Sequence, residues 1–253
     1  MLGKDIAYSS SPAMQNAGFK ALGLDWTYEL RDTSEDRLES VVEELRASDV
    51  RGANVTIPYK QAVMAHLDTI DPEAVRARAV NTIVNDGGRL AGSSTDISAI
   101  RSAAAGMGIE VGAAKVVILG TGGAARAAEA ALAGAHITFV SRSPESADVA
   151  GRVIGWDEPA VAAASRSADL LINATPLGRR DEMPLRPAAL PAQGAVIDLV
   201  YVTGGTPLIR KARSLGLRSV DGWEILLLQG AASFELWTQK RAPLDAMRET
   251  LRP

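Results

Sequence analysis

The sequence contains no cysteine, which excludes disulfide bonds, thiolate nucleophiles and zinc–thiolate sites. Its two histidines, His66 and His136, lie far apart along the chain, so no metal site is predicted, although an all-carboxylate site stays open. No apolar run reaches the roughly 18 residues that a membrane span needs. The N-terminus also lacks the apolar core of a signal peptide. These absences predict a cytoplasmic protein with no membrane partner.

An excess of either charge is also missing. The 253 residues include 27 basic and 30 acidic side chains, which gives a net charge of −3. A nucleic-acid surface would need a clustered basic excess, so nucleic acid is not an expected partner. The chain is long enough for one large domain or two modest ones with cores of their own. Its oligomeric state stays open, a homodimer included.

The first part of the chain mixes helix and strand patterns. Ser11 and Pro12 have the features of an N-cap followed by a proline at the first helical position. The turn at residues 86–88, Asp-Gly-Gly, predicts a hairpin, and therefore at least one antiparallel pair. The expected elements are helices at 11–22, 32–47 and 60–67 and strands at 26–30, 52–57, 79–84 and 89–91.

The pattern changes near residue 97 and then alternates regularly. Short apolar runs at 116–120, 136–142, 168–174 and 194–201 alternate with helical stretches, the last at 207–214. Continuous apolar strands are typical of a parallel sheet covered on both faces. Strand–helix alternation predicts an α/β, doubly wound, Rossmann-like domain at 98–220 beside an N-terminal α/β domain at 1–97. Helices at 221–253 are expected to complete the first domain.

A glycine-rich turn follows the first strand of the second domain. Gly120, Gly122 and Ala125 form a G-x-G-x-x-A pattern that opens a helix. The glycines allow a tight turn and a close approach of the backbone to a pyrophosphate, and the helix N-terminus favours an anion. The alternative is a turn of small residues without a ligand. The expected cofactor residues in this turn are Gly120, Gly122, Gly123 and Ala124.

The end of the next strand indicates which dinucleotide binds. An NAD site usually carries an acid here, but this chain has Ser141, Arg142 and Ser143, with no acid before Glu145. Arginine can hold a 2′-phosphate with paired charge-assisted hydrogen bonds, so the sequence predicts NADP. The alternative is that Arg142 stacks on the adenine or faces water.

Several short motifs, in order, carry a family resemblance. They are S-x-S-P at 9–12, N-V-T-x-P-x-K at 54–60, A-V-N-T at 79–82, S-T-D at 94–96, the glycine turn, N-A-T at 173–175, D-x-x-Y at 198–201 and L-x-x-Q-G at 227–230. In this combination the chain resembles the shikimate dehydrogenase family over nearly its whole length. Each motif is weak alone, but their order and spacing are specific.

The resemblance implies NADP-dependent, reversible reduction of 3-dehydroshikimate to shikimate, a step of aromatic amino acid biosynthesis. It implies that Lys60 and Asp96 are the catalytic pair. The alternative for Lys60 is an ordinary surface lysine at the start of a helix. The alternative for Asp96 is an aspartate that only caps a helix. The alternatives for the whole protein are a quinate/shikimate dehydrogenase using NAD or both cofactors, and a catalytically weak nucleotide-binding paralogue.

The resemblance also implies the remaining binding residues. The substrate residues it implies are Ser9, Ser11, Thr56, Asn81, Tyr201 and Gln229. Beyond the turn, the cofactor residues are Ser141, Arg142, Ser143, Asn173, Ala174, Thr175 and Leu199. The alternatives are that Ser11 is only an N-cap, that Gln229 only lies on a polar helix face, and that residues 173–178 are a plain exit from a strand.

The chain departs from the family pattern at a few positions. Tyr8 and Gln15 each replace a usual histidine, Ser94 replaces a usual asparagine, and Trp223–Glu224 replace small or flexible residues. These changes leave Lys60 and Asp96 in place. They keep quinate or an amino analogue open as substrates.

Overall fold

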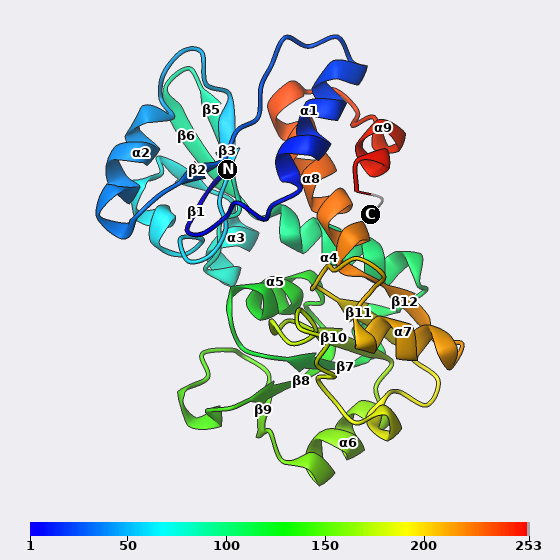
Figure 1. Cartoon of the computed structure of the whole chain (residues 1–253). Coiled ribbons are helices and arrows are strands. Elements are labelled where there is room, and N and C mark those ends of the chain that lie inside the picture. The colour runs from blue at the N-terminus through cyan, green and yellow to red at the C-terminus, as the bar shows by residue number, and fades with distance from the viewer. Residues whose placement is uncertain (252–253) are drawn as a thin grey trace. The chain divides into compact units, whose positions relative to one another are not determined.

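The computed structural model describes residues 1–251, with all side chains among them except that of Glu158, and these residues form two compact units (Figure 1). The first unit comprises Met1–Ser98 and the segment from Leu226 onward, and the second comprises Ala99–Ile225. The sequence predicted boundaries at 97 and 221. No helix in the part of the chain that the structure describes is both long and apolar enough to cross a membrane.

The first unit is built on a four-stranded sheet with the order β3-β5-β6-β4. Its strands are β3 (Gly52–Asn54), β4 (Thr69–Ile70), β5 (Thr82–Asp86) and β6 (Arg89–Ser93). The predicted hairpin is confirmed, because β5 and β6 pair antiparallel across the 86–89 turn. A separate parallel pair joins β1 (Leu2–Gly3) to β2 (Arg31–Asp32). Buried aliphatic side chains such as Leu2, Val55, Ile83 and Leu90 form the core of this unit.

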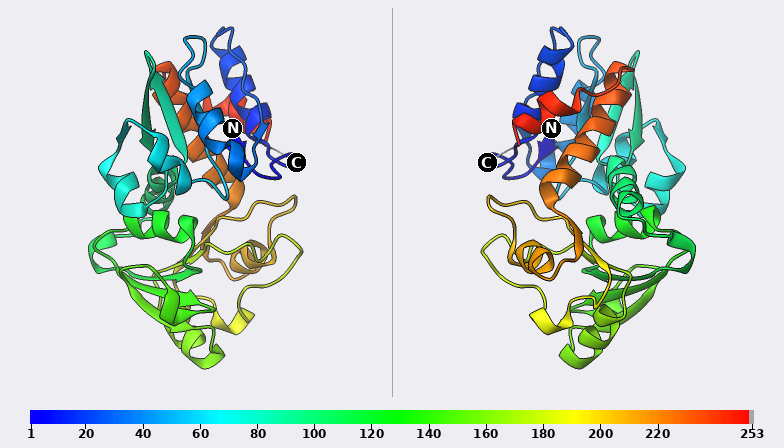
Figure 2. Two further views of the ribbon diagram at one scale, coloured as in Figure 1. Left: turned by 90° about the vertical axis from the view of Figure 1, so that its left-hand side faces the viewer. Right: turned by 90° about the vertical axis from the view of Figure 1, so that its right-hand side faces the viewer.

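The N-terminal and C-terminal helices of the first unit pack side by side (Figures 1 and 2). The ring of Phe19 on α1 (Ser11–Ala21) stacks on that of Phe234 on α8 (Gly222–Thr238), with centroids 5.2 Å apart. The buried amide of Gln15 donates to the carbonyl of Gly230 at 2.9 Å. Helix α9 (Leu244–Glu249) also contacts α1. The segment from Leu226 therefore belongs to the first unit.

The other helices of the first unit are short. They are the 3₁₀ helices η1 (Glu35–Arg37) and η2 (Ala62–His66) and the α-helices α2 (Leu38–Glu44) and α3 (Pro72–Ala77). Helix α4 (Thr95–Gly106) begins in the first unit and ends in the second.

Three local predictions for the first unit are wrong. Residues 26–30 form no strand, because the backbone of Tyr28 bonds the side chain of Asn16 at 2.7 and 3.1 Å instead of a neighbouring strand. The expected helix at 32–47 starts late, because the backbone N–H of Thr33 donates to Gly3 and holds this segment extended. The expected helix at 60–67 shrinks to η2, because the Lys60 carbonyl accepts from Val80.

The start of α1 also differs by one residue. Ser10 occupies the N-cap position and makes no capping bond with its side chain, while Ser11 is the first helical residue. The prediction that Ser11 is the N-cap is therefore wrong, and its hydroxyl is not used to cap the helix.

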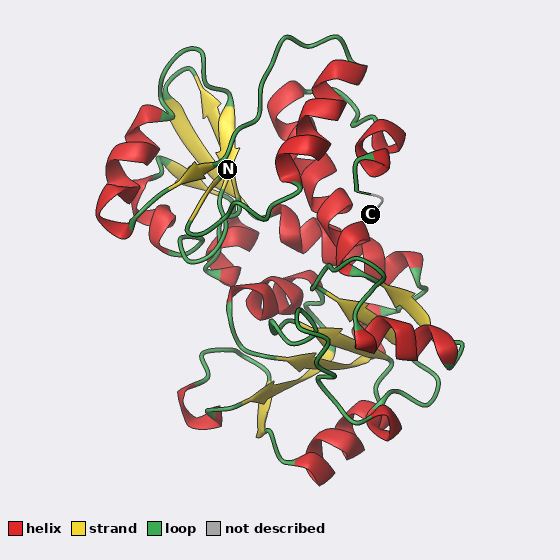
Figure 3. Cartoon of the chain, viewed as in Figure 1, coloured by secondary structure: helices red, strands yellow, loops and turns green. Residues whose placement is uncertain are grey.

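The second unit contains a six-stranded, all-parallel sheet with the order β12-β11-β10-β7-β8-β9. Helices lie on both sides of it (Figure 3). This confirms the predicted Rossmann-like α/β fold. Its strands are β7 (Lys115–Leu119), β8 (His136–Ser141), β9 (Arg152–Gly155), β10 (Leu170–Asn173), β11 (Ala195–Asp198) and β12 (Arg218–Val220). Its helices are α5 (Gly123–Ala131), α6 (Glu158–Arg166) and α7 (Pro207–Ser214), with 3₁₀ helices η3 (Val111–Ala113), η4 (Pro144–Ser146) and η5 (Pro187–Ala189).

The chain reverses direction across the sheet between β7 and β10. It runs outward from β7 to β8 and β9, then returns past β7 to form β10, β11 and β12. Ligands of doubly wound sheets bind at the carboxyl ends of strands next to such a reversal. Strands β9 and β12 were not among the predicted strands, because each is a short edge strand of three or four residues with no more than two consecutive apolar residues.

Candidate active site and nucleotide pocket

Lys60 and Asp96 are brought together in the first unit, although 36 residues separate them in the sequence. The ammonium Nζ of Lys60 lies 2.6 Å from Oδ2 of Asp96, and both side chains are about one-fifth exposed. A hydrogen bond from Val80 to the Lys60 carbonyl anchors the lysine backbone beside β5. Helix α4 begins at Thr95, so Asp96 lies within its first turn and is not the N-cap. The capping alternative for Asp96 is therefore wrong.

Asn81 orients the other oxygen of Asp96. Its amide nitrogen Nδ2 donates to Asp96 Oδ1 at 2.9 Å. Its amide oxygen accepts from the backbone N–H of Thr95 at 2.7 Å and from the hydroxyls of Thr82 and Thr95 at 3.1 and 3.2 Å. Because these donors all face the oxygen, the nitrogen must face Asp96. Both carboxylate oxygens of Asp96 thus accept bonds from defined donors, and the lysine is held on one side.

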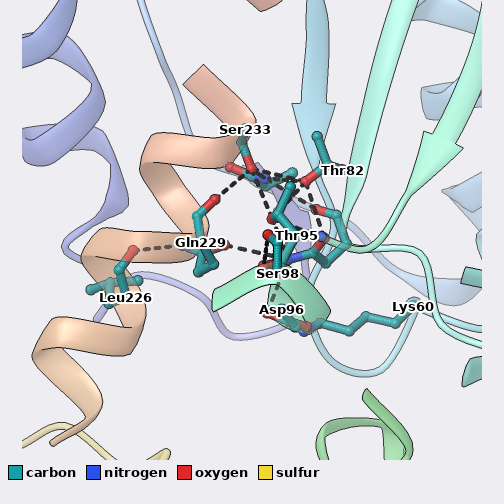
Figure 4. A network of polar contacts seen from close by, with 10 residues as sticks. Lys60, Thr82, Thr95, Asp96, Ser98, Leu226, Gln229 and Ser233 are labelled. Carbon is teal, nitrogen blue, oxygen red and sulfur yellow. Dashed lines mark hydrogen bonds and ion pairs between the residues drawn. The ribbon is translucent and has the colours of Figure 1, made fainter. Parts of the chain in front are cut away.

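Beneath this pair lies a buried network of neutral polar groups that was not predicted from the sequence (Figure 4). The hydroxyl of Ser233 on α8 lies 2.9 Å from Thr82 and 3.1 Å from Thr95, and it donates to the carbonyl of Gln229. The amide of Asn54 donates to Ser233 at 2.9 Å. Asn54, Thr82, Thr95 and Ser233 are all buried and hydrogen-bonded, and such networks are rigid because each partner is costly to lose.

Tyr28 closes the far end of this network. Its phenol donates to Oδ1 of Asn54 at 2.7 Å. Burial raises the pKa of Tyr28, so the phenol keeps its proton and remains a donor. The donor fixes which way the Asn54 amide points, and the Asn54 nitrogen then faces Thr82 and Ser233.

The predicted substrate residues of the first unit occupy three places. Ser9 and Ser11 form a pair, with their hydroxyl oxygens 3.2 Å apart. Within the described chain, the half-buried Thr56 has a hydroxyl without a protein partner, so it can bind a ligand. Gln229 lies beside the Lys60–Asp96 pair, because its Oε1 is 3.4 Å from Asn81 Nδ2. Its Nε2 donates to the Leu226 carbonyl of its own helix.

Tyr201 is the predicted substrate residue that does not belong to the first unit. It follows β11 in the second unit, and its ring packs against that of Trp223 with centroids 4.7 Å apart. The indole N–H of Trp223 donates to the Val202 carbonyl at 3.1 Å. The tryptophan that departs from the family pattern thus supports the loop that carries Tyr201.

The carboxyl ends of four strands in the second unit surround a pocket of about 560 Å³. It is lined by residues 120–122 after β7, 140–143 and 146 around and after β8, 156 after β9 and 174–177 after β10. Seven predicted cofactor residues lie here: Gly120, Gly122, Ser141, Arg142, Ser143, Ala174 and Thr175. Four others, Gly123, Ala124, Asn173 and Leu199, are not in the lining.

The glycine turn has the geometry that its pattern predicts. Gly120 has a φ of +100°, and a Cβ there would lie 3.1 Å from Thr175 and 3.2 Å from the Ala174 carbonyl oxygen. A Cβ on Gly122, by contrast, would meet nothing within 4 Å, so the space above this backbone is open to a ligand. Helix α5 begins directly after it with no side-chain cap, which leaves its first N–H groups available. The turn fits a pyrophosphate.

Asn173 and Leu199 do not line the pocket but form hydrogen bonds that hold the loop after β10, which does. The amide of Asn173 donates to Asp198 Oδ1 at 2.9 Å, and its oxygen accepts from the hydroxyl and N–H of Thr175 at 2.7 and 3.1 Å. The Leu199 N–H donates to the Asn173 carbonyl. Asp198 is fully buried, and burial raises its pKa to about 6 even though Thr206, Val200 and Asn173 bond it. This buried carboxylate anchors the loop after β10.

Arg142 has the freedom that a phosphate-binding residue needs. It is the only charged side chain in the lining of the pocket, and none of the described residues forms a hydrogen bond or ion pair with its guanidinium. Trp156 also lines the pocket and was not predicted, whereas Pro176 and Leu177 belong to the 173–178 loop that was expected at the cofactor. The position of Trp156 follows from strand register, which the sequence alone did not reveal. Residues 1–251 contain no cluster of three or more His, Cys, Asp or Glu side chains suited to a metal ion.

Known proteins show the same architecture. Residues 1–83 match the shikimate dehydrogenase substrate binding domain, and residues 222–252 match the shikimate 5′-dehydrogenase C-terminal domain. The shikimate dehydrogenase (NADP(+)) of Symbiobacterium thermophilum is 39% identical over 98% of this chain and 91% of its own length.

Solved structures agree over the full length. A shikimate 5-dehydrogenase from Thermus thermophilus, in complex with NADP(H) and shikimate, is 36% identical, with a TM-score of 0.88 over 99% of this chain and 96% of that one. A ligand-free 5-ketofructose reductase from Gluconobacter is 30% identical, with a TM-score of 0.85 over 99% and 95% of the two chains. With the paired Lys60 and Asp96 and the glycine-turn pocket, these similarities show that the chain belongs to the shikimate dehydrogenase family.

Proposed function

We propose that this protein catalyses the reversible, NADP-dependent reduction of 3-dehydroshikimate to shikimate. The observation that carries the proposal is the contact of 2.6 Å between the Lys60 ammonium and Asp96, with Asn81 bound to the second carboxylate oxygen. An acid–base pair of this kind serves proton transfer and has no use in a module that only binds nucleotide. Membership of the family supplies the substrate class.

Lys60 is the proposed proton donor. NADPH, when bound, would supply the hydride that reduces the carbonyl carbon of the substrate, and negative charge would then develop on the carbonyl oxygen. The Lys60 ammonium stabilises that charge and transfers one proton to the oxygen, which completes the alcohol. Asp96 holds the ammonium in place through its Oδ2. Because Lys60 is about one-fifth exposed, it can regain a proton from water after each turnover.

The surrounding hydroxyl and amide groups suit a polyhydroxylated ring with a carboxylate. We assign the substrate carboxylate to Ser9 and Ser11, since neutral hydroxyls can donate to it without adding a competing anion. Thr56, Asn81, Asp96 and Gln229 are assigned to the ring hydroxyls. Tyr201 is assigned a further substrate contact. The hydroxyl of Thr56 and the pair of serine hydroxyls are available for these bonds.

The pocket of the second unit is the proposed NADP site. The 120–122 turn and the start of α5, with Gly123 and Ala124, are assigned to the pyrophosphate. Ser141, Arg142 and Ser143 are assigned to the 2′-phosphate of the adenosine ribose. Ala174 and Thr175 line the pocket directly, while Asn173 and Leu199 hold that loop in position.

A steady-state assay tests the proposal. Purified protein is mixed with shikimate and either NADP or NAD, and the absorbance of the reduced nicotinamide is followed. Turnover is expected with shikimate and NADP. Lys60→Met is expected to lower kcat by about 10²–10⁴-fold, because it removes a general acid. Lys20→Met, which removes an exposed lysine from α1, is the matched control and is expected to keep the wild-type rate.

The alternatives give different results in the same assay. Equal or faster turnover with quinate, or with NAD, would identify a quinate/shikimate dehydrogenase instead. Absence of turnover with either substrate and either cofactor would contradict both enzymatic functions and favour a nucleotide-binding paralogue. A Lys60→Met variant as active as the Lys20→Met control would contradict the assigned proton donor.

A further inference from the structure

Trp156 stands apart from the other tryptophans of the chain. The rings of Trp26, Trp223 and Trp237 each pack against another aromatic ring, with centroids 4.7–5.9 Å apart. In the described part of the chain Trp156 has no such ring partner and no hydrogen bond for its indole N–H. It is 36% exposed and lines the pocket of the second unit. A large ring left without a protein partner inside a pocket is available to a ligand.

Strand register places Trp156 next to the proposed phosphate residue. Ser141 on β8 pairs with Gly155 on β9, so Arg142 and Trp156 are the next residues of two neighbouring parallel strands. Neighbouring strands lie about 4.8 Å apart, so both residues emerge at the same edge of the sheet. The side chain of Arg142, which is also free of protein partners among the described residues, lines the same pocket.

The chemistry of the lining limits what Trp156 can bind. The glycine turn provides backbone N–H groups and Arg142 provides the positive charge, so both suit phosphates. The ring of Trp156 carries no charge and only a single N–H at its edge, but its large apolar face suits a planar, aromatic group. In an NADP molecule whose 2′-phosphate binds Arg142, the adenine is attached to the same ribose. Adenine is therefore the aromatic group within reach.

We propose that Trp156 binds the adenine ring of the cofactor by stacking, and that it is a determinant of cofactor affinity with no part in proton or hydride transfer. The inference rests on the proposed NADP site and extends it to a residue that directly follows β9. NADP and NAD carry the same adenine ring, so stacking on this ring adds affinity for both cofactors. Discrimination between the two cofactors stays with Arg142.

Binding of 2′,5′-ADP tests the inference without any catalytic readout. By calorimetry, Trp156→Ala is expected to weaken binding roughly 5- to 100-fold, the range for losing one base-stacking aromatic ring. Trp156→Phe is expected to lose less, because a smaller ring face remains. Trp223→Phe, which changes the other tryptophan of the second unit, is the matched control and is expected to bind as the wild type does.

Fluorescence gives a second, independent readout. Binding of 2′,5′-ADP is expected to quench tryptophan emission of the wild type and of Trp223→Phe, but not of Trp156→Phe. Trp156→Ala should weaken binding of the hypoxanthine analogue of NADP as much as it weakens binding of NADP, because stacking does not depend on the edge of the base. If the variant weakened binding of NADP but not of the hypoxanthine analogue, stacking would be overturned as the mode of contact.

The outcomes separate this inference from the function on which it rests. Wild-type protein that binds 2′,5′-ADP, with a Trp156→Ala variant that binds it equally well, would overturn the inference alone. Wild-type protein that does not bind 2′,5′-ADP would overturn the NADP site and the inference together. Circular dichroism of Trp156→Ala that matches the wild type shows that any loss of affinity is local.

Discussion

Arg142 is the single residue expected to separate the two nicotinamide cofactors. Its guanidinium has no partner among the described residues and is the one charged group in the lining of the pocket. Arg142→Asp should raise the KM for NADP about 10- to 100-fold, the loss expected for hydrogen bonds to a charged group. It should lower the KM for NAD, because a carboxylate can accept from the free ribose hydroxyls. Steady-state kinetics with both cofactors measure this.

A matched variant controls for the change in charge. Arg152→Asp reverses an exposed arginine at the opposite end of β9, away from the carboxyl edge of the sheet. It is expected to leave both Michaelis constants near the wild-type values. If Arg142→Asp and Arg152→Asp give the same kinetics, Arg142 does not bind the 2′-phosphate.

Asp198 makes stability depend on pH. Burial raises its pKa from 3.8 to about 6, so the folded state holds this proton more tightly than the unfolded state does. The stabilisation is complete below about pH 4 and is lost as the pH rises through about 6. A shift of this size corresponds to about 3 kcal/mol in the free energy of unfolding.

The variant Asp198→Asn isolates this effect. The amide keeps an oxygen for the bonds from Asn173 and Val200 and cannot titrate. Between about pH 4 and 7, the wild type is expected to lose about 3 kcal/mol relative to the variant. Denaturant unfolding at a series of pH values measures the difference. Parallel stability curves for the two proteins would show that Asp198 keeps its ordinary acidity in the fold.

At the scale of elements, the polar network joins helix α8 to two strands of the sheet and to the start of α4. Ser233 on α8 contacts Asn54 on β3, Thr82 on β5 and Thr95 at the start of α4. These contacts hold Asn81, and through it Asp96, in position. The proposed catalytic pair of Lys60 and Asp96 thus depends on a helix residue that lies 138 positions after Thr95 in the chain.

Ser233→Ala should therefore lower stability by about 1–3 kcal/mol, because it leaves buried donors with fewer partners. The expected fall in kcat is smaller than for Lys60→Met, since no reacting group is removed. Ser40→Ala, which changes an exposed residue of α2 in the same unit, is the matched control. Chemical denaturation measures the stability of both variants. A Ser233→Ala variant as stable as Ser40→Ala would mean that the network is loosely bonded in solution.

At the scale of the whole molecule, the proposed sites belong to different units. The proposed NADP site lies in Ala99–Ile225, and the Lys60–Asp96 pair lies in the unit formed by Met1–Ser98 and the segment from Leu226. A ligand that binds only folded protein stabilises it by about 2.7 kcal/mol at roughly a hundred times its Kd. NADP at that excess should raise the Tm of the wild type, and Arg142→Asp should abolish most of the rise.

A variant of the first unit, Lys60→Met, provides the contrast with Arg142→Asp in the NADP-induced rise in Tm. Lys60→Met should show the same NADP-induced rise in Tm as the wild type, because it changes no residue of the nucleotide pocket. Thermal melts with and without NADP measure this. Loss of the rise in Lys60→Met would mean that the lysine supports the nucleotide pocket rather than the chemistry.

Much of this organisation was accessible from local sequence. Alternating apolar runs predicted the parallel sheet, because strands buried on both faces must be apolar throughout. The glycine turn was predictable because Gly120 needs a positive φ and a close approach to Ala174 that other residues resist. Lys60 and Asp96 were found through short motifs in a specific order. Each of these signals is contained within a few neighbouring residues.

Contacts between distant segments were decided only by the tertiary structure. The strand expected at 26–30 is absent because Asn16 bonds the Tyr28 backbone. The position of Trp156 beside Arg142 depends on the register of β9, and the orientation of Asn81 depends on Thr82 and Thr95. The raised pKa of Asp198 depends on what buries it. The sequence by itself determined the chemistry of the groups and the type of fold, since both follow from local composition and period. Which groups meet was settled by packing, because their partners lie in segments that are distant along the chain.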